Sequence, residues 1–138
     1  MRMRDRNRPE RRAAMAARAN AGVKAEKGRT TTMETPLSVR TLGVEIDEKL
    51  RVYLRQRLGF KLGKFAPRTR RVSVRLVDES GPKGRPTFIC RMKVVLDPAN
   101  DVVVEESRED LHSAIDGAMD RAERSIRRAL EKVRDQHR

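Results

Sequence analysis

Residues 107–134 read SREDLHSAIDGAMDRAERSIRRALEKVR. Apolar residues recur in them at intervals of three and four, which predicts one amphipathic helix over about Arg108–Arg134. Ser107 followed by Asp110 has the spacing of a capping box and predicts the start of this helix. Acidic residues crowd its first half and basic residues its second half, which is the polarity that the helix dipole favours.

Four stretches upstream of this helix alternate apolar and polar residues. Alternation with a period of two places one set of side chains on each face of a strand, so each stretch predicts a β-strand. Gly/Pro-rich or Asn/Asp-rich turn residues separate the last three. The stretches are residues 37–40, 72–76, 88–96 and 102–106.

A second helix is predicted between the first two strands. Isoleucine or leucine recurs every fourth residue from Ile46 to Leu62, which indicates a helix over about Asp47–Phe65 that Pro67 closes. The order of elements is therefore β-α-β-β-β-α. We expect a two-layer α+β domain in which two helices cover one face of a four-stranded sheet.

The composition excludes several classes of protein. The chain has 138 residues, 33 Lys+Arg against 20 Asp+Glu, and one cysteine. This length allows one ordinary domain, and no stretch approaches the ~20 apolar residues of a membrane helix. A single cysteine forms no internal disulfide and no cysteine cage for a metal. We expect a cytoplasmic protein, and its net charge of +13 indicates a polyanionic partner, nucleic acid before acidic membrane.

The first 33 residues differ from the rest. They hold ten basic and three acidic residues, no aromatic residue and no apolar face, which predicts a disordered basic extension before a domain at 34–138. Three interpretations of this extension stay open: a nucleic-acid-binding arm, an organellar transit peptide, or an appendage ahead of a natural start at Met33.

The densest charge lies between Lys49 and Val77, where ten basic residues occur without one acidic residue. Exposed faces normally mix charges of both signs, so an unopposed run favours contact with an anion. Few aromatic residues are present to stack on bases. We therefore expect arginine and lysine contacts to phosphates, and a structured RNA recognised by shape as the partner.

We recognise no catalytic motif in the sequence. His112 and His137 have no neighbours in a metal-ligand pattern, and Cys90 falls on the apolar side of a predicted strand. The acidic residues 105–110 suit a sheet edge and a helix start, and the loop 81–84 lacks the spacing of a phosphate-binding loop. We expect no enzyme activity, no cofactor and no metal.

Six short motifs share their order and spacing with one known family. They are GVEI (43–46), LRVYL (50–54), LGFKLGKF (58–65), RVSVRL (71–76), DESGPKG (78–84) and EDLHSAID (109–116). With them, residues 36–134 resemble the ribosome hibernation-promoting factors, a family that includes the ribosome-associated translation inhibitor called protein Y. His112 departs from the pattern, because the family often has tyrosine there. Since longer members carry a second, dimerising domain, the chain looks like the short form.

The resemblance implies a double-stranded-RNA-binding-like fold and a stationary-phase or stress function in the bacterial cytoplasm. Such proteins bind the small ribosomal subunit and sterically block the mRNA and tRNA channel, and we expect a monomer off the ribosome. A general RNA- or DNA-binding module, or a sigma-factor-modulating interaction domain, is the alternative. By matched position, the resemblance places rRNA contacts on Arg57, Lys61, Lys64, Arg71, Arg75, Lys83, Arg91, Lys93, Arg121, Arg124, Arg128 and Lys132.

Overall fold

The computed structural model describes residues 34–82 and 84–137, so the predicted extension at 1–33 lies outside the described residues. The helices and strands follow the predicted order, with one added 3₁₀ helix. The elements are β1 (Leu37–Leu42), α2 (Glu48–Leu62), the 3₁₀ helix η2 (Gly63–Arg68), β2 (Thr69–Asp78), β3 (Phe88–Leu96), β4 (Val102–Arg108) and α3 (Leu111–Gln136).

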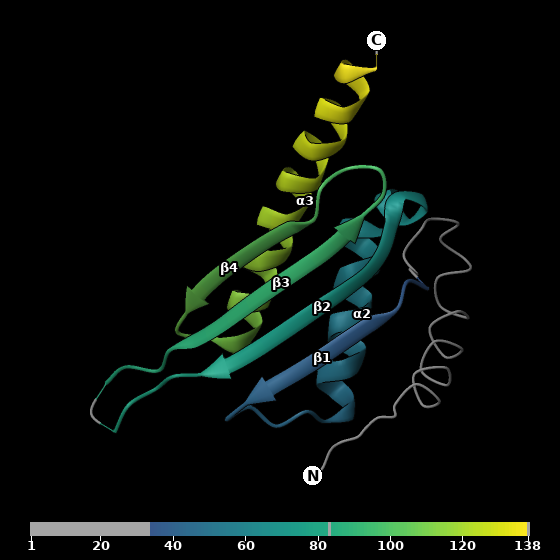
Figure 1. Ribbon diagram of the computed structural model, residues 1–138. Coiled ribbons are helices and arrows are strands. Elements are labelled where there is room, and N and C mark those ends of the chain that lie inside the picture. Colours follow the sequence, from purple (N-terminus) through teal and green to yellow (C-terminus); the bar gives the residue numbers. More distant parts are fainter. Residues whose placement is uncertain (1–33, 83, 138) are drawn as a thin grey trace.

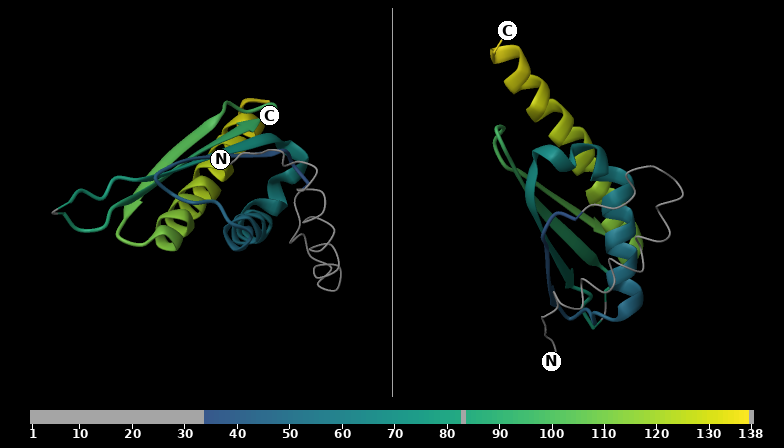
Figure 2. Two further views of the ribbon diagram at one scale, coloured as in Figure 1. Left: turned by 90° about the horizontal axis from the view of Figure 1, so that it is seen from below. Right: turned by 90° about the vertical axis from the view of Figure 1, so that its right-hand side faces the viewer.

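The strands form one mixed sheet in the order β1-β2-β3-β4 (Figure 1). β1 runs parallel to β2, and the other neighbouring pairs are antiparallel. Both helices lie against the same face of the sheet (Figure 2). This arrangement confirms the predicted two-layer α+β fold, and it leaves the opposite side of the sheet, here called the outer face, uncovered by either helix.

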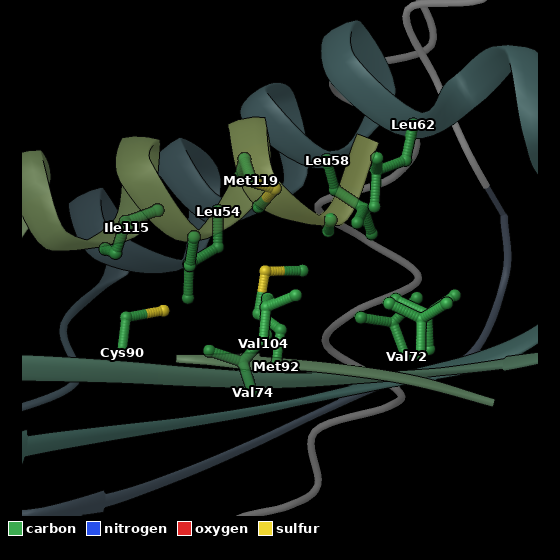
Figure 3. Packing of buried hydrophobic residues seen from close by; sticks show 14 of the residues in the cluster. Leu54, Leu58, Leu62, Val72, Val74, Cys90, Met92, Val104, Ile115 and Met119 are labelled. Atoms are coloured by element: carbon green, nitrogen blue, oxygen red, sulfur yellow. The ribbon is translucent and has the colours of Figure 1, made fainter. Parts of the chain in front are cut away.

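The core lies between the helices and the sheet, as the apolar periodicities predicted. Leu54, Leu58 and Leu62 of α2 are at most 1% exposed, since a spacing of four keeps them on one side of the helix. Ile115 and Met119 of α3 are equally buried and point toward the sheet (Figure 3). Each such side chain stabilises the fold by about 1.5–3 kcal/mol through its removal from water.

The start of α3 differs from the prediction. Ser107 was wrong as the N-cap, because it belongs to β4, where it pairs with Ile89 of β3. Asp110 caps the helix instead, and its carboxylate accepts a hydrogen bond of 2.9 Å from the backbone N–H of Ser113. Backbone pairing with β3 extends β4 as far as Arg108, so the helix begins three residues later than expected.

The end of α2 also differs. The helix begins after Asp47, whose carboxylate accepts a 2.8 Å hydrogen bond from the N–H of Leu50, close to the predicted start. It ends at Leu62 instead of Phe65, and the chain tightens into η2, which contains Pro67. A proline lacks the N–H that an α-helical turn needs, so the shorter helix follows from the sequence.

Helix α3 is longer than the sheet it covers. Its C-terminal end projects past the loop between β3 and β4 (Figure 1), and residues 134–136 are all exposed there. Within the described ranges, no helix is both long and apolar enough to cross a membrane.

Candidate nucleic-acid interface

The basic run between Lys49 and Val77 does not form one surface, because part of it faces acidic residues of α3. Lys61 Nζ lies 2.7 Å from Asp120 Oδ1 and 3.3 Å from Glu123 Oε1. Lys64 contacts the other oxygen of Glu123. The line along which α2 and η2 contact α3, here called the helix seam, thus pairs its charges.

A second pair closes the helix seam near the start of α3. Arg57 Nε lies 3.2 Å from Asp116 Oδ1, and the hydroxyl of Tyr53 donates a 2.6 Å hydrogen bond to the same oxygen. Burial, reinforced by that hydrogen bond, raises the pKa of Tyr53 to about 12. The helix seam comprises Arg57, Lys61, Lys64, Asp116, Asp120 and Glu123.

Hydrogen bonds across the helix seam favour the charged forms of Glu123 and Lys61. The hydrogen bond from Lys64, with a further one from Lys61, holds the pKa of Glu123 below its ordinary value. The hydrogen bond to Asp120 raises the pKa of Lys61. The expectation that the basic run is unopposed was therefore wrong for these residues, since helix packing supplies acidic partners about sixty positions away in the sequence.

The outer face of the sheet has the opposite character. The strand register places Arg40 of β1 beside Arg75 of β2, and Arg75 beside Arg91 of β3. This arginine row ends at Glu105 of β4, whose Oε1 lies 3.5 Å from Arg91 Nη1. Neither Arg40 nor Arg75 has an ion pair with any residue that the structure describes.

Two further cations share the outer face with the arginine row. Arg71 precedes Arg75 by four positions on β2, and Lys93 lies on β3. Lys93 Nζ is 3.8 Å from Asp101 in the following loop, a distance too long for a strong pair. Exposed arginine and lysine, without an aromatic side chain among the outward strand positions, suit phosphates better than stacked bases.

A third cationic surface runs along α3. Arg121, Arg124, Arg128 and Lys132 follow one another at intervals of three and four, which places them on one side of the helix. This side, here called the α3 flank, turns toward β4, because Arg121 Nη1 lies 3.0 Å from Glu106 Oε2. The remaining three cations have no ion pair within the described part of the chain.

Glu106 anchors the start of the α3 flank. Its side chain is 12% exposed and binds both Arg108 and Arg121, and the hydrogen bond from Arg108 is the main reason that its pKa is lowered. Gly117 makes room for this contact, because a Cβ atom at 117 would lie 2.7 Å from Arg108 Nη2. Glu106 thereby ties β4 to α3 and fixes the position of Arg121.

The structure divides the twelve rRNA-contact residues expected from the sequence. The helix seam holds Arg57, Lys61 and Lys64, and Lys83 lies outside the described residues. The outer face holds Arg71, Arg75, Arg91 and Lys93, and the α3 flank holds Arg121, Arg124, Arg128 and Lys132. The predicted set did not include Arg40, which the structure places beside Arg75 on the outer face; the alternation over residues 37–40 already turned it away from the core.

Cys90 and His112, which were considered for catalysis or metal binding, both take part in packing. Cys90 is fully buried, and burial raises the pKa of its thiol to about 12, so hardly any thiolate forms at neutral pH. The ring of His112 packs edge-on against Tyr53 with 4.4 Å between the centroids. Among residues 34–82 and 84–137, no group of three or more His, Cys, Asp or Glu is placed to hold a metal.

A two-layer domain with unpaired cations on two surfaces is suited to binding a folded RNA. The chain belongs to the family described as Sigma 54 modulation protein / S30EA ribosomal protein, whose profile matches residues 37–134. This match confirms the resemblance to the ribosome hibernation-promoting factors.

Two solved structures are similar to this chain. The N-terminal domain of Thermus thermophilus Protein Y matches with 25% identity and a TM-score of 0.53, over 70% of this chain and 97% of that one. A ribosomal subunit interface protein from Coxiella burnetii shares the fold at 15% identity and a TM-score of 0.57, over 68% of this chain and 96% of the other. No curated protein matches the sequence significantly.

Proposed function

We propose that this protein binds the small ribosomal subunit through phosphate contacts to rRNA and inhibits translation by occupying the mRNA and tRNA channel. The family to which it belongs and the similarity to Protein Y support ribosome binding. The observation that carries the mode of binding is the α3 flank, where Arg124, Arg128 and Lys132 are exposed and have no ion pair in the described part of the chain.

The geometry of the α3 flank suits an RNA backbone. From Arg121 to Lys132 the helix advances about 16 Å at its ordinary rise per residue, far enough to contact several phosphates. A guanidinium presents a planar fork of donors that binds phosphate oxygens in pairs, and arginine supplies three of the four cations. Since phosphates carry no sequence information, the flank recognises RNA by shape.

Inhibition then needs no chemical step. A domain bound where mRNA and tRNA pass excludes them by volume alone, and its release restores translation. Because phosphate binding releases counterions, the affinity falls steeply as salt increases. The protein acts in the cytoplasm under starvation or stress, when idle ribosomes are kept for later use.

Co-sedimentation with purified small subunits tests this proposal. The wild-type protein is expected to migrate with the subunits at low salt, to leave them at high salt, and to inhibit cell-free translation. R124E/R128E is expected to bind about 100-fold more weakly, since each lost charged hydrogen bond contributes about 1.5 kcal/mol or more.

A matched variant separates position from net charge. R70E/R85E changes the charge by the same amount, at two arginines that already have exposed acidic partners, Asp97 and Glu109. We expect its affinity to stay within threefold of wild type. The proposal is contradicted if the wild-type protein stays in the soluble fraction at low salt, or if it binds an unrelated RNA duplex as tightly as the subunit.

A further inference from the structure

We propose that Phe60 of α2 stacks on an unpaired base of the rRNA, so that the domain contacts one nucleotide by its base and others by their phosphates. This inference rests on the proposed ribosome binding and adds a contact that the cationic surfaces do not supply. It starts from two observations, the exposure of the Phe60 ring and the guanidinium of Arg57 over that ring.

Phe60 is the exception among the aromatic residues. The chain has three phenylalanines and one tyrosine. Phe60 is 64% exposed, whereas the other three are buried or pack against the core: Tyr53, Phe65 and Phe88. The leucines of α2 that face the core recur every fourth position, and residue 60 falls midway between two of them, about 200° around the helix from each. The same period that builds the core therefore turns the Phe60 ring into water.

The exposed ring contributes little to the fold. Phe60 belongs neither to the buried core nor to the partly buried residues that pack against it. Phenylalanine also favours a helix less than alanine, leucine or lysine does, because its ring loses rotamer freedom against the preceding turn. A contact that forms on binding accounts for an aromatic residue at this position, and the stability of the free domain does not.

Arg57 places the ring before any partner arrives. Its guanidinium carbon lies over the Phe60 ring, 5.4 Å from the ring centroid, which is within the range of a cation–π contact. Arg57 Nε in turn lies 3.2 Å from Asp116 Oδ1, the same oxygen that accepts the hydrogen bond from Tyr53. Because α3 and Tyr53 hold the guanidinium, the ring beside it has fewer rotamers to lose when a base binds.

The surroundings of Phe60 favour a base over a phosphate. The cations within four positions of it are Arg57, Lys61 and Lys64, and all three contact carboxylates of α3. A phosphate gains little there, whereas an aromatic ring binds a base through its π-face without needing a free charge. A base inside a duplex is already stacked on both faces, so the partner is a base in a loop, in a bulge or at an end.

A protein partner fits the surroundings of Phe60 less well. A stable protein interface buries about 800 Å² on each side around an apolar centre of several residues. The other exposed large hydrophobic residues, Leu42 and Val103, lie on β1 and β4 and not on α2. A lone ring among charged side chains is too small for such a centre, but it is the size of the platform that one base needs. We therefore assign Phe60 to a base.

Substitutions that separate the aromatic ring from apolar bulk test the inference. F60Y keeps the ring, and F60L keeps an apolar side chain with high helix propensity but has no ring. We expect F60Y to bind small subunits within threefold of wild type and F60L to bind about tenfold more weakly, with unchanged melting temperatures. L42A shortens another exposed apolar side chain and, as the matched control, is expected to bind like wild type.

Two outcomes of this series overturn the inference. The first is an F60L variant that binds as tightly as wild type. The second is an F60Y variant that binds as weakly as F60L, which would indicate a protein pocket shaped for phenylalanine. If the wild-type protein does not bind the subunit at all, the proposed function fails instead. If R124E/R128E loses affinity and F60L does not, only the stacking of Phe60 is excluded.

Ultraviolet cross-linking of the bound complex gives a direct readout. Short-wavelength light joins an aromatic side chain to a base stacked on it, and trypsin then cuts after Arg57 and Lys61, so that residues 58–61 carry the adduct. We expect one nucleotide on this peptide from the wild-type protein and none from F60L. A peptide 58–61 without an adduct, in a complex whose other peptides are cross-linked, would overturn the inference.

Discussion

The helix seam and the outer face of the sheet both take cations from the basic run at residues 49–77, yet they differ in what surrounds those cations. In the seam, Lys61 and Lys64 meet Glu123 of α3. On the outer face, Arg75 meets Arg40 and Arg91. The comparison shows that a run of basic residues in a sequence does not by itself define a basic surface, because folding assigns partners to some of them and none to others.

The two regions also contribute differently to stability. The seam pairs opposite charges between helices, with Glu123 only 18% exposed, and so favours the folded domain. The arginine row opposes folding through like-charge repulsion. A surface whose like charges lower stability is expected where a bound anion offsets the repulsion. In the helix seam, by contrast, the cations already contact carboxylates and have few free donors for a phosphate.

The largest expected effect comes from combining the two unpaired surfaces. R75E on the outer face and R128E on the α3 flank are each expected to weaken subunit binding about tenfold or more. If the surfaces meet different RNA segments, the losses multiply, and R75E/R128E binds at least about 100-fold more weakly. Filter binding measures the affinity of all three variants for small subunits. If R75E/R128E loses no more affinity than either single variant, the two surfaces are not independent.

Acid is expected to unfold the domain through its paired carboxylates. Hydrogen bonds, chiefly from Lys64 to Glu123 and from Arg108 to Glu106, lower both pKa values below the ordinary 4.5. A lowered folded-state pKa means stability that is complete above about pH 4.5 and is lost as the pH falls through the folded-state value. Thermal melts should give a constant Tm from pH 7 to about 5 and a falling Tm below that. A Tm that rises on acidification runs against this assignment.

A smaller effect is expected from removing one acid of the helix seam. E123Q leaves Lys61 and Lys64 without their shared carboxylate, and we expect it to lower the free energy of unfolding by about 1 kcal/mol. Subunit affinity measured at a temperature where the variant is folded should stay within threefold of wild type. Urea denaturation supplies the first number, and a binding loss as large as that of R75E would show that the seam contacts RNA.

The smallest expected effect is a gain in the stability of the fold. R75Q removes the central charge of the arginine row, and we expect it to raise the free energy of unfolding by a few tenths of a kcal/mol in low salt. The gain should vanish near 1 M salt, where charges on the surface are screened. Urea denaturation at two salt concentrations checks this, with R71Q as the control, because Arg71 stands opposite Val95. Equal gains in R75Q and R71Q would rule out cross-strand repulsion.

The sequence predicted the fold because the core repeats with clear periods. The four-residue spacing of leucines from Leu50 to Leu62 and the alternation in β2 and β3 arise from burial on one side, and both were found as expected. The ends of the helices were predicted less well. The start of α3 depends on pairing between β3 and β4, which moved the N-cap from Ser107 to Asp110.

The candidate site could be predicted only as a collection of basic residues. Whether a cation is paired depends on contacts between segments that are distant in the sequence. Lys61 is paired because α2 packs against Asp120 of α3, and Arg75 is unpaired because the strand register places Arg91 beside it. Arg40 was left out of the predicted set for the same reason: its position beside Arg75 follows only from the pairing of β1 with β2. The periodicity of a chain carries information about burial, but little about which charges meet.

The salt dependence of subunit binding tests most directly that unpaired cations, and not paired ones, contact rRNA. Three variants lower the net charge by two: R40Q/R75Q on the outer face, R124Q/R128Q on the α3 flank and K61Q/K64Q in the helix seam. Each lost phosphate contact reduces the slope of log K against log salt by about 0.7–0.9. We predict slopes reduced by about 1.5 for the first two variants and unchanged for the third; equal slopes for all three would contradict the account.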